Sequence, residues 1–219
     1  MLHMVPFKEA LDFGWKSFKE NIGLVVQIAL LGIVYLVFEG YLDETLGQKK
    51  GQIEIVTFYL FLRIALFVFN QGISAGFLML GLKLFKKEPV RLIEILQGFR
   101  IVWNYIGLMI LMSLAVLGGL ILFIVPGIII GIRIQFAPLL MVDKGFGPVE
   151  AIRESWSMTN GIGWKLFCFG FLSGLLNILG LFCLIIGVVI TFFVTWMAYF
   201  YLYRNLADQI EPHTESAVT

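Results

Sequence analysis

The sequence predicts an all-α integral membrane protein with six transmembrane helices, arranged as three pseudo-repeats of an amphipathic helix followed by a helical hairpin. Three observations predict this fold: an apolar composition, four long apolar runs, and three similar segments that each begin with proline. Of the 219 residues, 59% are hydrophobic and 14% are charged, whereas a typical soluble domain carries about 25% charged residues. The net charge of +1, with no clustered basic patch, argues against a nucleic-acid partner.

The apolar runs are long enough for six membrane crossings, because one crossing takes roughly 20 helical residues. The runs cover residues 22–42, 57–84, 104–142 and 164–203. The first two each give one span. The last two are about twice the required length, and each has a helix breaker near its middle, Pro126 and Gly127 in one and Gly187 in the other. Each of these two runs is therefore predicted to form a helical hairpin.

The basic residues orient the predicted spans. Of the 16 Lys and Arg residues, Lys49 and Lys50 fall between the first two spans, and Arg63 and Arg133 lie within apolar runs, which leaves twelve on the side of the two termini. These twelve are Lys8, Lys16, Lys19, Lys83, Lys86, Lys87, Arg91, Arg100, Lys144, Arg153, Lys165 and Arg204. Basic residues accumulate on the cytoplasmic side of membrane proteins. The sequence thus predicts a multi-pass protein of the cytoplasmic (inner) membrane with cytoplasmic N- and C-termini.

Three similar segments predict an internal repeat. They are PFKEALDFGWKSFKENIGL from Pro6, PVRLIEILQGFRIVWNYIGL from Pro89 and PVEAIRESWSMTNGIGWKL from Pro148. Proline suits the first turn of a helix, where its missing N–H has no helical partner to lose. Apolar residues at helical spacing follow each proline, as at Val149, Ile152 and Trp156. Each segment is therefore expected to form an amphipathic helix that leads into a span.

The repeat predicts one domain, residues 1–208, with repeats at about 6–85, 89–142 and 148–206 and a short cytoplasmic tail at 209–219. We expect the six spans to form a compact bundle with the three amphipathic helices along its cytoplasmic face. These helices either brace the bundle at the level of the lipid head groups or dock a partner protein. The candidate docking residues are Arg153, Glu154 and Trp156.

Arg133 lies within the apolar run GIIIGIRIQFAPLL. An arginine at a helix centre costs roughly 2.5 to 3.5 kcal/mol on insertion scales, so its side chain is expected to face the bundle interior or water. Four further polar residues are estimated to lie at a similar depth: Asn70, Gln71, Gln135 and Asn177.

Two interpretations of this polar layer remain open. In the first, the side chains hydrogen-bond to one another and to backbone freed by Pro138, which joins helices at about 1 kcal/mol per contact. In the second, Arg133 is the floor of an outward-open pocket for a phosphate or carboxylate head group, because a guanidinium binds such oxyanions through two hydrogen bonds.

Arg63 is the other arginine within an apolar run. The second span is long enough to begin after it, so Arg63 is expected to extend to the outer interface, paired with Glu39 at the end of the first span. The sequence therefore predicts different roles for the two arginines.

The sequence offers little for catalysis. Its two histidines, His3 and His213, lie in terminal segments, and no acidic residue falls well inside a predicted span. Walker A and HExxH motifs do not occur, which argues against the enzyme classes that use them. The letters GISAG at residues 72–76 fit GxSxG, but they lie inside an apolar run, where small residues are typical of close helix packing. Ion-coupled transporters usually carry carboxylates within the membrane, so the lack of acidic residues well inside the predicted spans argues against this class as well. The sequence predicts a non-enzymatic protein with no cofactor and no metal site.

The stretch from Phe123 to Phe167, FIVPGIIIGIRIQFAPLLMVDKGFGPVEAIRESWSMTNGIGWKLF, resembles a family of bacterial and archaeal polytopic membrane proteins. The family includes the YciC-type proteins and the membrane domain that precedes the catalytic barrel of some glycerophosphoryl diester phosphodiesterases. The resemblance is carried by the proline-glycine turn, by the arginine followed by FAPLLMVD, and by GPVEAIRESW ending at TNG. It implies a six-span fold and an association with membrane phospholipid. It does not imply phosphodiesterase activity, because such a barrel needs about 250 residues.

These observations predict a protein that binds or translocates an anionic lipid or another amphiphile, with Arg133 at the head group. Gln135, Asn70, Gln71 and Asn177 are the candidate supporting residues. The alternative is a structural or accessory membrane subunit that docks a partner through its cytoplasmic amphipathic helices. The expected partners are membrane lipids and, under the alternative, a protein at the cytoplasmic face. A homo-oligomer is compatible with both.

Overall fold

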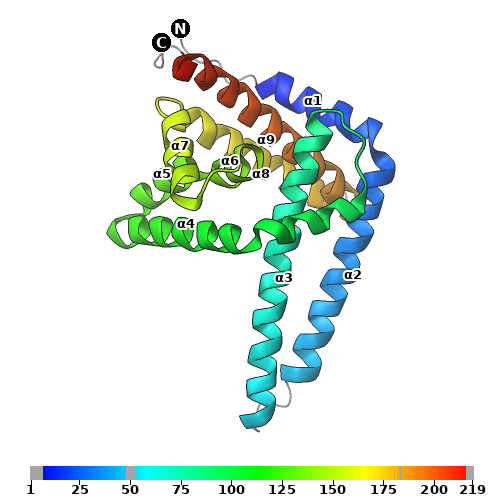
Figure 1. Ribbon diagram of the computed structural model, residues 1–219. Coiled ribbons are helices and arrows are strands. Elements are labelled where there is room, and N and C mark those ends of the chain that lie inside the picture. The colour runs from blue at the N-terminus through cyan, green and yellow to red at the C-terminus, as the bar shows by residue number, and fades with distance from the viewer. Residues whose placement is uncertain (1–6, 48–52, 183, 216–219) are drawn as a thin grey trace.

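The computed structural model describes residues 7–47, 53–182 and 184–215, and these residues form helices with no strand among them (Figure 1). The elements, in chain order, are α1 (Phe7–Glu20), α2 (Ile22–Gly47), α3 (Ile53–Phe85), the 3-10 helix η1 (Leu92–Ile101), α4 (Val102–Leu122), α5 (Ile124–Ile134), α6 (Ala137–Lys144), α7 (Pro148–Met158), α8 (Gly163–Phe182) and α9 (Leu184–Glu215).

Six helical segments of the described chain are long and apolar enough to cross a membrane, which confirms the number predicted from the sequence. They are Ile22–Leu42, Thr57–Phe85, Leu92–Leu122, Ile124–Lys144, Gly163–Phe182 and Gly187–Asp208. The connection expected between the first two spans is partly helical, because α2 continues to Gly47 and α3 begins at Ile53. Residues 209–215, predicted as a tail, continue α9.

The tight hairpin turn between α4 and α5 lies before its predicted breakers. Phe123 alone separates the two helices, with an extended backbone (φ −164°, ψ 157°). Pro126 is therefore in the first turn of α5, where its missing N–H has no helical partner to lose. A Cβ on Gly119 would lie 2.8 Å from the Cα of Gly127, so Gly127 permits close packing of the two helices and does not form the turn. Gly187 likewise lies in the first turn of α9.

The three prolines of the predicted repeat behave differently. Pro148 is the first residue of α7, as predicted. Pro89 lies in an extended segment before η1, whose N-cap is Arg91 (φ −122°, ψ 139°). The prediction of a helix that starts at Pro89 is wrong, because the chain needs extended residues to turn back from α3 and lay η1 across it. Pro6 lies outside the described residues.

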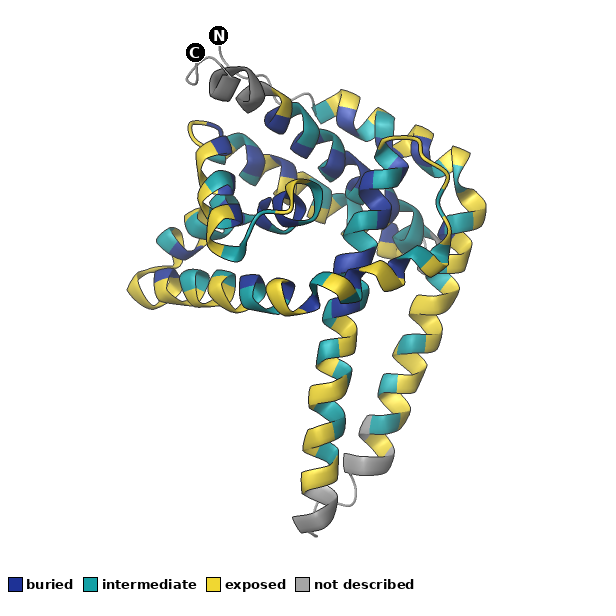
Figure 2. Ribbon diagram, in the orientation of Figure 1, coloured by how far each residue is buried: buried dark blue, intermediate teal, exposed yellow. Residues whose placement is uncertain are grey.

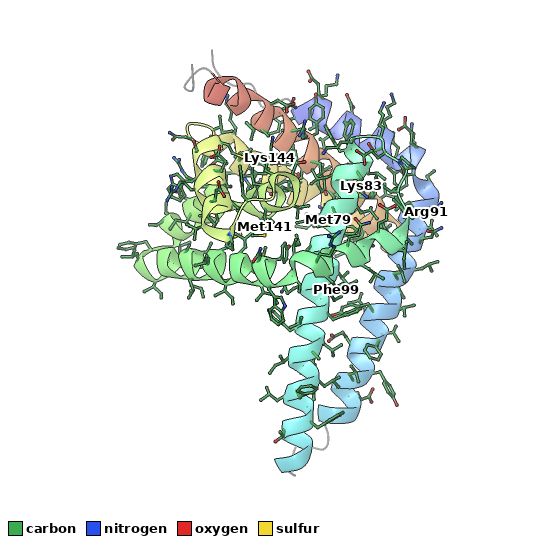
Figure 3. The ribbon with its side chains drawn as sticks, viewed as in Figure 1. Met79, Lys83, Arg91, Phe99, Met141 and Lys144 are labelled. Atoms are coloured by element: carbon green, nitrogen blue, oxygen red, sulfur yellow. The ribbon has the colours of Figure 1, made fainter. Side chains whose placement is uncertain are left out.

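η1 packs mainly against the long helix α3 and α1 against the long helix α9, whereas α7 packs against the short helix α6 and also against α4 and α5. Small residues make the closest contacts. A Cβ on Gly98 of η1 would overlap the backbone of α3 at Gly72 and Gly76, and a Cβ on Gly14 of α1 would overlap the backbone of α9 at Val194. Figure 3 shows η1 crossing α3 at the level of Phe99.

The core lies where α4, α6 and α9 meet. Its large buried side chains come from these three helices and from the connection between α5 and α6. They include Leu108, Phe136, Leu139, Phe200 and Tyr203. The buried residues concentrate there, whereas the α2–α3 pair projects from the rest with exposed surfaces along most of its length (Figure 2). The expected compact bundle is therefore wrong for this pair. Apolar helices need not pack against one another where lipid tails, which are equally apolar, can surround them.

A single carboxylate joins three helices at this core. The side chain of Asp143 on α6 is 4% exposed, and it accepts hydrogen bonds from Lys86 (3.2 Å), Tyr203 (3.0 Å) and Arg204 (3.3 Å). Lys86 follows α3, and the other two donors belong to α9. The sequence analysis missed this role, because it searched for acids well inside the spans. The detectable signal was an acid directly after the apolar residues LLMV.

Candidate functional site

Arg133 lies at a break between two helices. α5 ends at Ile134 and α6 begins at Ala137, and Pro138 in the first turn of α6 cannot supply the N–H that would continue the α5 hydrogen-bond ladder. The hydroxyl of Tyr199 on α9 donates to the carbonyl of Gln135 (2.6 Å), the residue directly after α5. One of the backbone groups at the break is thus satisfied by a side chain from another helix.

Two further buried hydroxyls, those of Ser155 on α7 and of Thr159 directly after α7, contact the backbone of this break. The Oγ of Ser155 donates to the carbonyl of Arg133 (2.8 Å) and accepts from the N–H of Phe136 (3.2 Å). The Oγ1 of Thr159 also donates to the carbonyl of Arg133 (3.1 Å). Ser155 and Thr159 are both 0% exposed. Buried backbone groups require hydrogen-bond partners, so these contacts fix the position of the break. They also fix the backbone position from which the Arg133 side chain extends.

The Arg133 side chain is half-buried and has two neutral partners. Its Nη1 donates to the Oδ1 of Asn160 (3.1 Å), and its guanidinium carbon lies 5.1 Å from the ring centre of Trp156. The second contact has the geometry of a cation–π interaction. Within the described residues no carboxylate forms an ion pair with Arg133. No acidic side chain of the described residues therefore compensates the charge of the guanidinium.

The guanidinium borders a groove of about 580 Å³ between α5 and the start of α8. The described lining residues are Val125, Ile128, Ile129, Ile132, Arg133, Gly161, Gly163, Trp164 and Phe167. Arg133 is the charged residue in this set, and the other side chains present carbon. A site with one cation at the edge of a carbon-lined groove suits an amphiphile with an anionic head.

The predicted supporting residues on α3 lie elsewhere. The Nδ2 of Asn70 donates to the hydroxyl of Tyr35 on α2 (3.1 Å), and the hydroxyl of Ser74 donates to the Oδ1 of Asn70 (3.4 Å). Gln71 is half-buried on α3 beside the crossing of η1. Asn70 thus joins the first hairpin instead of completing a site around Arg133.

Asn177 joins the last hairpin. Its Nδ2 donates to the Oγ1 of Thr195 on α9 (3.2 Å) and to the carbonyl of Ser173 (2.9 Å). Gln135 is half-buried in the helix break and lies two residues from Arg133. Of the predicted supporting residues, Gln135 is therefore the one that the fold places next to Arg133.

The three candidate docking residues of α7 have separate surroundings. Arg153 is exposed, Glu154 is half-buried and Trp156 is 41% exposed. Because the ring of Trp156 lies against Arg133, a residue predicted for docking belongs to the surroundings of the candidate binding residue. A substitution of Arg153 therefore tests the exposed face of α7 separately from the surroundings of Arg133.

The sequence analysis missed Ser155, Thr159 and Asn160. It recognised α7 by its apolar ladder, but Val149 on that ladder is 61% exposed, and the buried residues of α7 are Ala151, Ser155 and Met158. The available signal was a second stripe of small residues at helical spacing. Small and hydroxyl-bearing residues are common where helices pack closely in membranes.

The predicted pairing of Arg63 is confirmed. Its Nη1 lies 2.8 Å from the Oε2 of Glu39, and its Nε donates to the hydroxyl of Tyr59 (2.9 Å). Tyr35 donates to the other oxygen of Glu39 (3.0 Å). The charge of Arg63 is thus neutralised within its own hairpin.

Among the described residues, no group of three or more His, Cys, Asp and Glu side chains is placed to hold a metal ion. No protein-family model, curated protein or solved structure matches this chain. The resemblance of residues 123–167 to the polytopic membrane family therefore stays a prediction, and the site is interpreted from its geometry.

Proposed function

We propose that this chain is a multi-pass protein of the cytoplasmic membrane, with both termini on the cytoplasmic side, that binds or translocates an anionic amphiphile. The head group contacts Arg133, and the hydrocarbon lies in the groove between α5 and α8. One observation carries this proposal: a half-buried guanidinium without a carboxylate partner, among the described residues, borders a groove whose other side chains present carbon.

The guanidinium is prepared for an oxyanion. It carries five N–H donors in a fixed plane, and the hydrogen bond to Asn160 uses one of them. Asn160 and the face of Trp156 hold the group in place, so little side-chain freedom is lost when a ligand binds. A phosphate or carboxylate can then accept two parallel hydrogen bonds, the arrangement that favours arginine over lysine at such sites.

The head group must supply most of the selectivity. A hydrocarbon tail gains little by leaving lipid for a carbon-lined groove, since lipid tails are as apolar as the side chains of Ile128 or Phe167. Moving a hydrocarbon tail from lipid into the groove therefore changes the free energy little. The charge of Arg133 determines which amphiphile binds. This reasoning predicts that replacing Arg133 weakens binding strongly, whereas a change in tail length has a small effect.

We also propose that the fold is built from three pseudo-repeats. Its support is that η1 and α7 each pack against the helix that precedes them, α3 and α6, and that α1 packs against α9. Each segment also makes a close contact through a small residue, Gly14, Gly98 or Ser155, followed in each case by an aromatic residue.

The test is the affinity of the full chain in mild detergent for phosphatidylglycerol, measured by native mass spectrometry. We expect Arg133→Gln to weaken binding about 100-fold, the equivalent of losing a hydrogen-bonded charge pair. The thermal unfolding temperature should stay close to that of the wild type, because the variant keeps the backbone carbonyl of residue 133 that accepts the buried hydrogen bond from Ser155.

Arg153→Gln is the matched control, because it removes the same charge from the exposed face of α7. It should leave phosphatidylglycerol binding unchanged. If Arg133→Gln lowers the unfolding temperature and leaves lipid binding intact, Arg133 only joins helices and the proposal fails. If Arg153→Gln abolishes the cellular function while lipid binding persists, the accessory-subunit alternative gains support.

A further inference from the structure

The two helices of the first hairpin leave space between them. Long polar side chains link α2 and α3 across this space, through Arg63 to Glu39 (2.8 Å) and through Asn70 to Tyr35 (3.1 Å). The hairpin projects from the rest of the protein, so neither helix is covered there by another element (Figure 1). The space between α2 and α3 is therefore bounded by the hairpin itself and by η1.

This space is a groove of about 610 Å³ lined by carbon. Its walls are Ile28, Leu31, Gly32, Val34, Tyr35 and Phe38 of α2 and Phe69, Ile73 and Phe77 of α3, and Leu92, Ile93, Ile95 and Leu96 of η1 close one end. Ile93 and Leu96 are 68% and 49% exposed, so η1 presents apolar surface to the groove and not only to the core.

Gly32 widens the groove. Glycines at other helix crossings, such as Gly76 and Gly98, lie where any Cβ would overlap the backbone of a neighbouring helix. A Cβ on Gly32 would meet nothing within 4 Å. Glycine destabilises a helix interior relative to alanine, and at Gly32 no close helix approach offsets that effect. What the missing side chain provides at this position is room in the groove.

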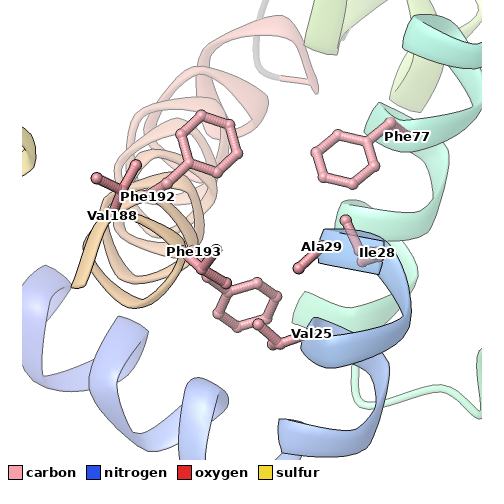
Figure 4. Close-up of a pocket in the computed structure, with 8 residues that line it drawn as sticks. Val25, Ile28, Ala29, Phe77, Val188, Phe192 and Phe193 are labelled. Atoms are coloured by element: carbon pink, nitrogen blue, oxygen red, sulfur yellow. The ribbon is translucent and has the colours of Figure 1, made fainter. Parts of the chain in front are cut away.

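A smaller cavity of about 150 Å³ lies on the other side of α2, between α2, α3 and α9. Figure 4 shows Ile28 and Phe77 on one side of it, with Phe192 and Phe193 of α9 opposite. Ile28 and Phe77 line both this cavity and the groove. Apolar space therefore flanks this part of α2 on two sides, as expected for a helix that packs against hydrocarbon more than against protein.

A chain of polar side chains begins beside the groove and continues toward the far end of the hairpin. It runs from Ser74 through Asn70, Tyr35, Glu39 and Arg63 to Tyr59, with each link a hydrogen bond of 2.8 to 3.4 Å. Since Glu39 and Arg63 neutralise each other, this chain offers both a positive and a negative group but no net charge. It differs in this respect from the guanidinium of Arg133, which has no ion-pair partner in the described part of the chain.

We infer that the groove between α2, α3 and η1 binds one acyl chain of a zwitterionic phospholipid, with the head group toward Glu39 and Arg63. Protein interiors and their contacts are close-packed, and a carbon-lined space holds no stable water because it offers no polar partners. Within a membrane, hydrocarbon is what remains to fill it. The paired charges match a head group that carries both signs. The inference rests on the proposed membrane location but not on the Arg133 site.

The test uses native mass spectrometry of the full chain in detergent with phosphatidylethanolamine as the probe. A Cβ at Gly32 meets nothing within 4 Å, so we expect Gly32→Leu to extend into the groove and to weaken the tightest phosphatidylethanolamine site about tenfold by excluding part of the tail. Gly40→Leu is the matched control, because Gly40 is also on α2, is also open to a Cβ and does not line the groove. It should leave binding unchanged, and thermal unfolding should show both variants folded.

The two proposed sites give separable outcomes. Arg133→Gln should leave phosphatidylethanolamine binding intact, and Gly32→Leu should leave phosphatidylglycerol binding intact. Equal phosphatidylethanolamine affinity in the wild type and in folded Gly32→Leu would overturn the inference. So would displacement of phosphatidylethanolamine from the groove by equimolar phosphatidylglycerol, since that result would show a preference for anionic head groups. Neither result would bear on whether Arg133 binds its own ligand.

Discussion

The first hairpin and the corner formed by α5, α7 and α8 each hold an arginine within an apolar run, and they treat its charge in opposite ways. Arg63 has the carboxylate of Glu39 at 2.8 Å and the hydroxyl of Tyr59 at 2.9 Å. Arg133 has an amide oxygen, from Asn160, and an aromatic face. The comparison teaches that an arginine in an apolar run becomes a candidate binding residue when the fold withholds its counter-ion.

The two regions also differ in how a long helix accepts the segment that crosses it. α3 runs unbroken from Ile53 to Phe85, because Gly72 and Gly76 let η1 approach its backbone. The span that contains Arg133 is broken instead, and Ser155 fills the break with hydrogen bonds. The crossing at the broken span is the one that places an arginine, Arg133, beside a groove.

The largest effect on this comparison should come from removing the counter-ion of Arg63. Glu39→Gln leaves a half-buried guanidinium without its carboxylate, and we expect a loss of about 3 kcal/mol in the free energy of unfolding, the lower end of the range for buried ion pairs. The measurement is thermal unfolding of the purified protein in detergent. Arg63 would then resemble Arg133, and phosphatidylglycerol binding to the first hairpin should rise.

The double variant Glu39→Gln/Arg63→Met provides the control, since replacing both partners of an ion pair with neutral groups is often close to neutral. It should recover most of the lost stability. A double variant as unstable as Glu39→Gln alone would show that the ion pair is not the source of the effect.

A smaller loss should follow from opening the helix break. Ser155→Ala removes the acceptor for the N–H of Phe136 and one donor to the carbonyl of Arg133, and a buried unpaired backbone group costs about 2 kcal/mol. We expect a lower unfolding temperature. We also expect weaker phosphatidylglycerol binding, because the backbone that positions the Arg133 side chain becomes mobile. Ser157→Ala on the exposed face of α7 is the control. Unchanged stability in Ser155→Ala would contradict the role of this hydroxyl.

The smallest effect should come from the aromatic face beside Arg133. Trp156→Leu removes the cation–π contact, which is worth about 1 kcal/mol, and should weaken phosphatidylglycerol binding about fivefold. Trp156→Phe keeps an aromatic face and should lose less. The measurement is the same lipid titration, and stability should change little because Trp156 is 41% exposed. Tighter binding in Trp156→Leu would mean that the ring competes with the ligand for the guanidinium.

The sequence by itself determined the all-helical architecture, the six candidate spans and the partnership of Arg63 with Glu39. These features depend on hydropathy, on length and on position along a helix, all of which are local properties of the chain. The same reasoning placed Pro148 at the start of α7. It failed for Pro89, because the backbone there follows the return of the chain toward α3.

Only the tertiary structure decided which way each polar side chain points. Counting residues gives the depth of Arg133, Asn70 and Asn177 along their helices but not the rotation of each helix about its axis, which packing sets. The rotation of each helix therefore determines which partner its polar side chain contacts. Asn70 contacts Tyr35, Asn177 contacts Thr195, and Arg133 contacts Asn160 and Trp156. The buried face of α7 and the contacts of Asp143 with three helices depend on packing for the same reason.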